Sequence, residues 1–273
     1  MASVRESSFV RPAVVRRIRF GRRQLRQAAH AQQIANFSIS SHRGHGMSVS
    51  AKYLIGQIAG MAIVFSVLLF VPAGTAAWPA AWVFLVMMFA FTIALSVWLM
   101  RFDPELLEER MSGVGKSDQK TWDKVLLAFV GIAFFAWLTV MGVDRRFHLS
   151  RVPLWLGGVG AVMLVLSFGV FYLTFRENTY LSPAVRVQKE RSQVVVSTGP
   201  YARVRHPLYA GFVLYTFGTA LLLGSWLGVV GALVLIVLVA YRAVMEERVL
   251  REELDGYSVY MNLVRWRLVP HVW

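Results

Sequence analysis

Two short polar segments flank an apolar hairpin and hold the side chains best suited to chemistry. The first, Thr198 to Tyr209, contains Arg205-His206-Pro207, and the second, Arg242 to Leu254, contains Glu246-Glu247. Arginine can bind a carboxylate through both arms of its guanidinium, histidine can donate or accept a hydrogen bond, and glutamate can bind a cation or take a proton. Because both segments border apolar stretches, they predict a polar binding site at the edge of a membrane.

Six apolar stretches surround these segments and must position them. The chain has 273 residues, of which 56% are hydrophobic, and it contains no cysteine. Repeated apolar runs near twenty residues are typical of membrane-spanning helices, and the absence of thiols excludes disulfides and thiolate chemistry. The sequence therefore predicts an all-α, polytopic transmembrane helical bundle of about six spans. The runs fall at about 53–72, 78–100, 124–143, 153–175, 208–223 and 226–243.

The last two stretches are shorter and meet at Gly224-Ser225, which predicts a short C-terminal helical hairpin. Several glycines recur on single helix faces, where small residues let helices approach closely in a membrane. One glycine cluster follows no predicted strand, so it indicates helix packing and not a nucleotide-binding loop. The glycines at these packing positions are Gly157, Gly158, Gly160, Gly211, Gly218, Gly228 and Gly231.

The start of the hairpin is the strongest candidate for binding an anion. Pro207 fits the first turn of a helix, whose exposed amides can bind a carboxylate. Arg203 or Arg205 could add a bidentate contact, or could simply mark the cytoplasmic end of a span. His206 can donate or accept a hydrogen bond, and no metal site is predicted, because no second histidine or cysteine lies nearby in the sequence.

The return helix offers a second charged group. Arg242 and Glu246 are four residues apart and face the same way. They form either a surface ion pair or a functional pair, in which Arg242 orients an acceptor while Glu246 or Glu247 binds a cation. If the acceptor is an amine, one glutamate could instead take its proton. Tyr201 and Tyr209 are likewise either site hydroxyls or tyrosines of the interfacial belt.

Lysine and arginine are distributed unevenly between the predicted loops. The segments 101–124, 176–206 and 242–273 hold five, six and five of them, whereas 73–77 and 224–225 hold none and the 144–151 loop holds three. The positive-inside rule therefore predicts that both termini and both polar segments lie in the cytoplasm. We also expect a short interfacial helix over 101–111 and a weakly strand-like segment over 177–197.

The first 46 residues differ in composition from the rest of the chain. They contain nine arginines and one glutamate and no sustained apolar run, within a chain of net charge +14. The segment could be a basic arm on anionic lipid, an organelle transit peptide, or an upstream extension with Met47 as the natural start. We favour the third and predict a disordered extension over 1–46 and an integral membrane domain over 47–273.

The motifs of the C-terminal part resemble a known family. The segment Gly199 to Gly211, GPYARVRHPLYAG, is followed by the apolar hairpin, the Glu246-Glu247 pair, Tyr257-Ser-Val-Tyr260 and Arg267-Leu-Val-Pro270. This order resembles the bacterial branch of the isoprenylcysteine carboxyl methyltransferase family. That branch belongs to a membrane methyltransferase superfamily that also includes phospholipid N-methyltransferases.

The resemblance implies an S-adenosyl-L-methionine cofactor in a cytoplasmic-facing pocket, built mainly by residues 176–273. It implies methyl transfer, favouring carboxylate O-methylation, to a lipophilic small molecule or a lipidated acceptor, in the inner membrane of a bacterium. Membrane lipids are expected partners and nucleic acid is not; the oligomeric state stays open. Arg242 and Glu246 are the implied catalytic residues. The implied cofactor-binding residues are Tyr201, Arg203, Val204, Arg205, His206, Pro207, Tyr209, Gly211, Glu246 and Glu247.

Two other activities remain open at this point, as does a non-enzymatic membrane protein that keeps the scaffold. A membrane reductase of the steroid-reductase type, which uses NADPH, shares the Arg-His-Pro-x-Tyr element. A phospholipid N-methyltransferase would use the same cofactor on an amine. The Glu246-Glu247 pair and the Arg-Leu-Val-Pro ending favour a methyltransferase over the reductase.

Overall fold

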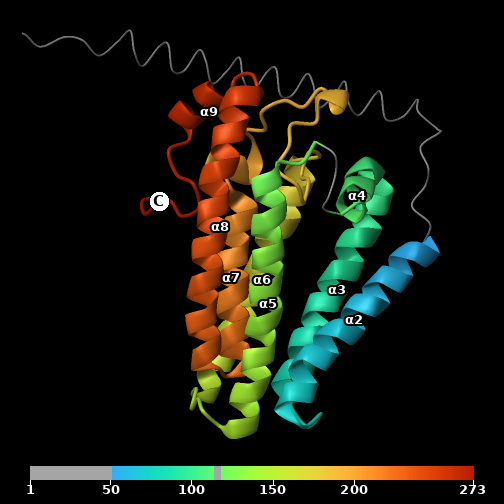
Figure 1. Ribbon diagram of the computed structural model, residues 1–273, viewed down its shortest axis with the longest axis vertical. Coiled ribbons are helices and arrows are strands. Elements are labelled where there is room, and N and C mark those ends of the chain that lie inside the picture. Colours follow the sequence, from blue (N-terminus) through green and yellow to red (C-terminus); the bar gives the residue numbers. More distant parts are fainter. Residues whose placement is uncertain (1–50, 114–117) are drawn as a thin grey trace, which may run out of the picture.

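The computed structural model describes residues 51–113 and 118–273, and six apolar helices form the bundle in this part of the chain (Figure 1). Five of them are long and apolar enough to cross a bilayer, and the 17-residue α7 is shorter, at about 25 Å. The predicted all-α, multi-span fold is confirmed. The six are α2 (Ala51–Ala73), α3 (Pro79–Phe102), α5 (Thr121–Phe147), α6 (Leu154–Glu177), α7 (Pro207–Leu223) and α8 (Trp226–Glu253).

The bundle has a tight part and a splayed part. Helices α5, α6, α7 and α8 stand side by side, whereas α2 and α3 lean away from them toward the end where α4 lies (Figure 1). The interior is aromatic: Tyr215 of α7 lies among Phe84, Phe134 and Phe168, and its hydroxyl donates to Met88 Sδ at 3.4 Å. The core therefore links helices from both parts.

The outer surface of the long helices is apolar. Val165 of α6 and Val237 of α8 are 59% and 67% exposed, and Ile132 of α5 is 67% exposed. Water solvates such a continuous apolar surface poorly and lipid tails solvate it well. The protein is accordingly an integral, multi-pass membrane protein.

Two short helices lie at the end of the bundle opposite the α7–α8 turn: α4 (Pro104–Met111) and α9 (Tyr257–Leu263) (Figure 1). Asp103 caps α4 by accepting a hydrogen bond from the Leu106 amide at 3.0 Å, and Pro104 occupies its first turn. Leu106 and Leu107 pack against Phe175 of α6. The predicted short helix after the second span is thus confirmed.

The α7–α8 hairpin turns where its sequence predicts. Gly224 ends α7 in the left-handed region, at φ 75°, a conformation that costs glycine little. Ser225 caps α8, because its hydroxyl accepts from the Gly228 amide at 2.8 Å. Helix α8 continues without a break for 28 residues to Glu253, so it carries the second polar segment beyond the apolar run.

Close glycine contacts join the helices, as predicted, except at Gly158, where a Cβ would have nothing within 4 Å. A Cβ on Gly160 of α6 would lie 2.5 Å from the Leu222 amide nitrogen and 2.6 Å from the Gly218 carbonyl oxygen, both in α7. On α8, a Cβ on Gly228 or Gly231 would meet Met141 or Trp137 of α5. The glycines of the hairpin therefore pack it against α6 on one side and against α5 on the other.

We expect Gly160→Ala to destabilise the protein by about 1–3 kcal/mol, because the added methyl group meets backbone atoms that cannot move aside. Gly158→Ala is the matched control: it lies on the same helix, and a Cβ there would have nothing within 4 Å. Thermal melting of both variants in detergent checks the prediction. Equal melting temperatures would contradict the close packing of α6 on α7.

The segment between α6 and α7 forms no strand among the described residues, so the strand-like pattern over 177–197 is wrong as a structural prediction. Side chains satisfy backbone groups that a second strand would otherwise pair. The Val185 amide donates to Asp123 Oδ2 at 2.8 Å and the Gln188 amide donates to Gln193 Oε1 at 2.8 Å. Two 3₁₀ turns, Lys189–Arg191 and Gly199–Ala202, shape the rest. The predicted extension over 1–46 lies outside the described residues.

Candidate active site

The hairpin brings the two polar segments together at one end of the bundle. Arg205-His206-Pro207 leads into α7, with Pro207 at its first position, and α8 returns antiparallel beside it. Tyr209 Oη donates to Glu246 Oε2 at 2.6 Å, and Arg205 Nε donates to Glu247 Oε1 at 2.7 Å. Residues some forty positions apart in the chain are thus in direct contact.

Glu247 is the buried anchor of this arrangement, with a side chain 3% exposed. Besides Arg205, its carboxylate meets His206 Nε2 at 3.2 Å and Arg267 Nε at 2.9 Å. A carboxylate in an apolar setting is stable only when it is paired and hydrogen-bonded. Glu247 therefore ties the start of α7, helix α8 and the C-terminal segment into one unit.

The C-terminal segment also pairs with the motif through its backbone. The amides of Arg205 and His206 donate to the carbonyl oxygens of Trp266 and Arg267, each at 2.9 Å. The Arg205 guanidinium donates to the Val264 and Arg265 carbonyls at 2.8 and 2.7 Å. Arg205 thus has its hydrogen-bonding capacity largely filled by the protein itself.

Arg242 contacts the same Tyr209 hydroxyl as Glu246. Its guanidinium donates to Asp123 Oδ1 at 2.9 Å, to the Pro183 carbonyl at 2.8 Å and to the Tyr209 hydroxyl, which in turn donates to Glu246. Arg242 and Glu246 do face the same side of α8, as predicted, but a tyrosine hydroxyl joins them in place of a direct ion pair. The acid that neutralises Arg242 is Asp123 of α5.

A cavity of about 300 Å³ opens between these groups and the segment that follows α6. This size is at the lower end of small-molecule sites. Its wall combines charged groups with apolar side chains such as Leu127, Val195 and Leu254. Of the predicted site residues, those that line it are Tyr201, Arg205, His206, Pro207, Tyr209, Arg242 and Glu246.

Four predicted site residues do not line this cavity. Arg203 is exposed, Val204 is buried elsewhere, and Glu247 lies behind the wall that it anchors. Gly211 contacts α6, because a Cβ there would lie 2.7 Å from the Phe171 ring, and its carbonyl accepts from Ser167 Oγ at 2.8 Å. Their assignment to cofactor binding stays a prediction. In the structure these four residues lie around the cavity and do not form its wall.

Tyr257 of α9 supplies a polar group that the protein leaves unpaired. It lines the cavity, it is 4% exposed, and within the described part of the chain its buried hydroxyl has no hydrogen-bond partner. Burial, followed by the nearby Glu247 and Glu246 carboxylates, raises the pKa of Tyr257. The hydroxyl therefore stays protonated and is available as a donor to a bound molecule.

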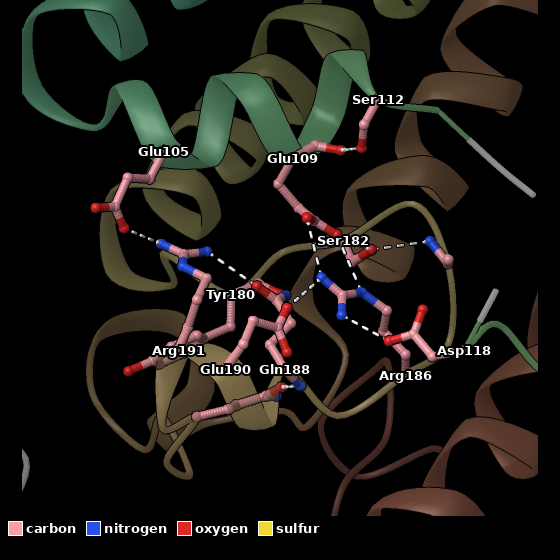
Figure 2. A network of polar contacts seen from close by, with 12 residues as sticks. Glu105, Glu109, Ser112, Asp118, Tyr180, Ser182, Arg186, Gln188, Glu190 and Arg191 are labelled. Atoms are coloured by element: carbon pink, nitrogen blue, oxygen red, sulfur yellow. Dashed lines mark hydrogen bonds and ion pairs between the residues drawn. The ribbon is translucent and has the colours of Figure 1, made fainter. Parts of the chain in front are cut away.

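Residues 178–197 contribute much of the cavity lining. Ion pairs join this stretch to α4 (Figure 2). Arg186 contacts Glu109 of α4 at 3.1 Å, and also Asp118 and Glu190, each at 2.7 Å. Ser182 Oγ donates to Glu109 Oε1 at 2.7 Å. We call this stretch the cover segment; its contacts hold α4 against the cavity.

Comparison with known proteins identifies the region that holds this site. Residues 155–255 match the family model described as phospholipid methyltransferase. The match begins in α6, includes the cover segment and the Arg205-His206-Pro207 motif, and ends just beyond α8. Over these residues the chain is similar to the phospholipid methyltransferase family. The membrane methyltransferase superfamily predicted from the motifs is thereby confirmed.

A solved structure is also similar to the chain. It is the eukaryotic intramembrane Ras methyltransferase ICMT (isoprenylcysteine carboxyl methyltransferase), solved without a monobody. The two share 16% sequence identity over 90% of this chain and 95% of that one, with a TM-score of 0.48. No curated protein matches the chain in sequence.

The candidate site contains residues that the motifs did not reveal. Asp123 lies 119 positions before its partner Arg242, and its sequence signal, an acid in the first turn of a span, is equally typical of a plain helix start. Asn178 holds the Tyr201 hydroxyl at 2.9 Å, and Arg110 reaches the cavity from α4. Only the folded chain brings these side chains to the motif.

Proposed function

We propose that the protein is an S-adenosyl-L-methionine-dependent membrane methyltransferase acting on a lipophilic acceptor, with carboxylate O-methylation favoured. The observation that carries this proposal is the cavity in the region of the phospholipid methyltransferase family, which presents Glu246 and the unpaired Tyr257 hydroxyl. Its apolar walls suit an acceptor that arrives from the bilayer.

The polar groups of the cavity fit the cofactor, which carries a sulfonium, an ammonium, a carboxylate and a nucleoside. Glu246 would bind its ammonium or ribose, and the Tyr257 hydroxyl would donate to one of its oxygens. Tyr201 and His206 offer ring faces and hydrogen-bonding groups at the wall. When bound, the cofactor supplies an activated methyl group on its sulfonium sulfur.

The chain's own residues would orient the acceptor and exclude water. Arg242 is held rigidly by Asp123 and Tyr209, so it can present a fixed positive charge to the acceptor. A carboxylate acceptor needs no base, and its charge is neutralised as the methyl group transfers, which a water-poor cavity favours. The cover segment and the apolar wall would keep water out.

Phospholipid N-methylation is the second candidate, and the family match over residues 155–255 favours it. An amine acceptor must lose a proton, and Glu246 would receive it, because among the described residues it is the carboxylate that lines the cavity. The two candidates share the cofactor site and differ in the role of Glu246.

Binding measurements on the purified protein test the proposal. We expect S-adenosyl-L-methionine to bind in detergent with a measurable heat, and NADPH to bind much more weakly. Transfer of a labelled methyl group to lipid extracts, followed by mild alkaline hydrolysis, then separates methyl esters from methylated amines. Tight binding of NADPH without binding of S-adenosyl-L-methionine would favour a reductase and contradict the proposal.

We propose that the cavity end of the bundle faces the cytoplasm, on the basis of the Lys and Arg distribution. Ser192 lies in the cover segment and Ala77 lies in the α2–α3 loop at the other end, and both are exposed. Because the chain has no cysteine, Ser192→Cys and Ala77→Cys each provide a single label site. In intact cells, an impermeant thiol reagent should label Ala77→Cys alone. Labelling of Ser192→Cys from outside would refute the orientation.

A further inference from the structure

We propose that Arg110, which lines the cavity from α4, forms a binding site for an oxyanion of the acceptor. The inference rests on the proposed function and specifies the class of acceptor: a lipophilic molecule with an anionic oxygen group. Arg110 lies in the last turn of α4, is partly buried, and lines the cavity.

The Arg110 guanidinium differs from the other arginines of the cavity wall because it has no acidic partner. Among the described residues, no carboxylate lies within ion-pair distance of it, and its close contact is the Phe175 ring, 5.3 Å from Cζ. Arg205, Arg242 and Arg186 instead pair with Glu247, Asp123 and Glu109. The neighbouring Glu109 directs its carboxylate to Arg186 and Ser182.

Arg110 also lies near another positive charge. Burial, and then the charge of Arg242, lower the pKa of Arg110. A partly buried cation without a counter-ion is costly, and a second cation nearby raises the cost. An anion bound between the two guanidiniums would remove this cost, and the planar fork of arginine suits a carboxylate or a phosphate.

The charge of the cofactor points to the acceptor as the source of that anion. S-Adenosyl-L-methionine carries one more positive than negative charge, so its binding adds positive charge to the cavity. Glu246 is the carboxylate that lines the cavity among the described residues. An acceptor with an anionic oxygen group would balance the remaining charge of Arg110. A carboxylate and a lipid phosphate share this chemistry.

The site is tested by thermal melting of the full chain in detergent, with octanoate, octyl phosphate or octanol added. We expect the two anions to raise the melting temperature of the wild-type protein and octanol to have little effect. In Arg110→Gln, the anion concentration that gives half of the maximal rise in melting temperature should increase about tenfold to a hundredfold. This is the change expected for loss of a charged hydrogen bond. The anion that stabilises the wild-type protein at the lower concentration shows whether the site prefers a carboxylate or a phosphate.

Two further variants and the cofactor make the outcome decisive. Arg101→Gln removes an exposed charge of α3 and should keep the anion effect, and Arg110→Lys should keep part of it. Ligand-free Arg110→Gln should melt no lower than wild type, because the removed charge has no partner. Stabilisation by S-adenosyl-L-methionine should persist in Arg110→Gln.

An anion effect that survives in Arg110→Gln, or an equal effect of octanol on the wild type, would overturn the inference. Loss of cofactor stabilisation in Arg110→Gln would also overturn it, because Arg110 would then hold the cofactor. Failure of S-adenosyl-L-methionine to stabilise the wild type would instead count against the proposed function, and the anion measurements would still report on Arg110.

Discussion

Glu246→Gln is expected to weaken S-adenosyl-L-methionine binding about tenfold to a hundredfold and to slow methyl transfer at limiting cofactor by at least the same factor, while the fold persists. Glutamine keeps the shape of the side chain and can still accept the hydrogen bond from Tyr209, but it loses the charge that would face the cofactor ammonium. Arg242 keeps its ion pair with Asp123, so neutralising Glu246 leaves this buried arginine with a counter-ion. Calorimetric titration of the cofactor measures the effect.

Glu252→Gln is the matched control for this change. Glu252 lies on the same helix, is exposed, and does not line the cavity. The same loss of charge there should leave cofactor affinity unchanged. Equal affinities of the two variants would mean that Glu246 does not touch the cofactor and that the binding site lies elsewhere.

Glu247→Gln, one position further along α8, should instead destabilise the protein by about 3–5 kcal/mol. Its carboxylate is 3% exposed and is shared by Arg205, His206 and Arg267. Without the negative charge, the buried Arg205 guanidinium lacks its counter-ion, and the start of α7 loses its link to α8. The free energy of unfolding in a denaturant titration, with circular dichroism as the signal, reports the loss.

Glu253→Gln gives the comparison for stability. Glu253 pairs with Lys120 at 2.6 Å, but the two side chains are 31% and 37% exposed. Exposed ion pairs contribute little to folding stability, so we expect Glu253→Gln to lower the free energy of unfolding by less than about 1 kcal/mol. If Glu247→Gln were no more harmful than Glu253→Gln, the anchoring role of Glu247 would be refuted.

Adjacent glutamates with different roles could not be told apart from sequence. Successive residues of an α-helix point about 100° apart, so one of Glu246 and Glu247 must turn away when the other faces the cavity. Which one does so depends on how α8 is rotated against α7. That rotation is fixed by packing, including the close contacts of Gly228 and Gly231 with α5.

The sequence by itself determined the features that depend on local composition. Apolar runs near twenty residues predict spans, Gly224-Ser225 predicts a tight turn, and Asp103-Pro104 predicts a helix start. It also determined that the two polar segments meet, because two helices joined by so short a turn must return to the same end. The superfamily followed from the order of these motifs.

Only the tertiary structure decided which charged side chains form ion pairs and which have no oppositely charged partner. Asp123 and Arg110 come from α5 and α4, and no local pattern links either to the motif more than eighty positions later. The strand-like pattern of the cover segment failed for a related reason: distant side chains such as Asp123 satisfy its backbone. Backbone geometry acts over a few residues, whereas ion pairing depends on how whole helices pack together.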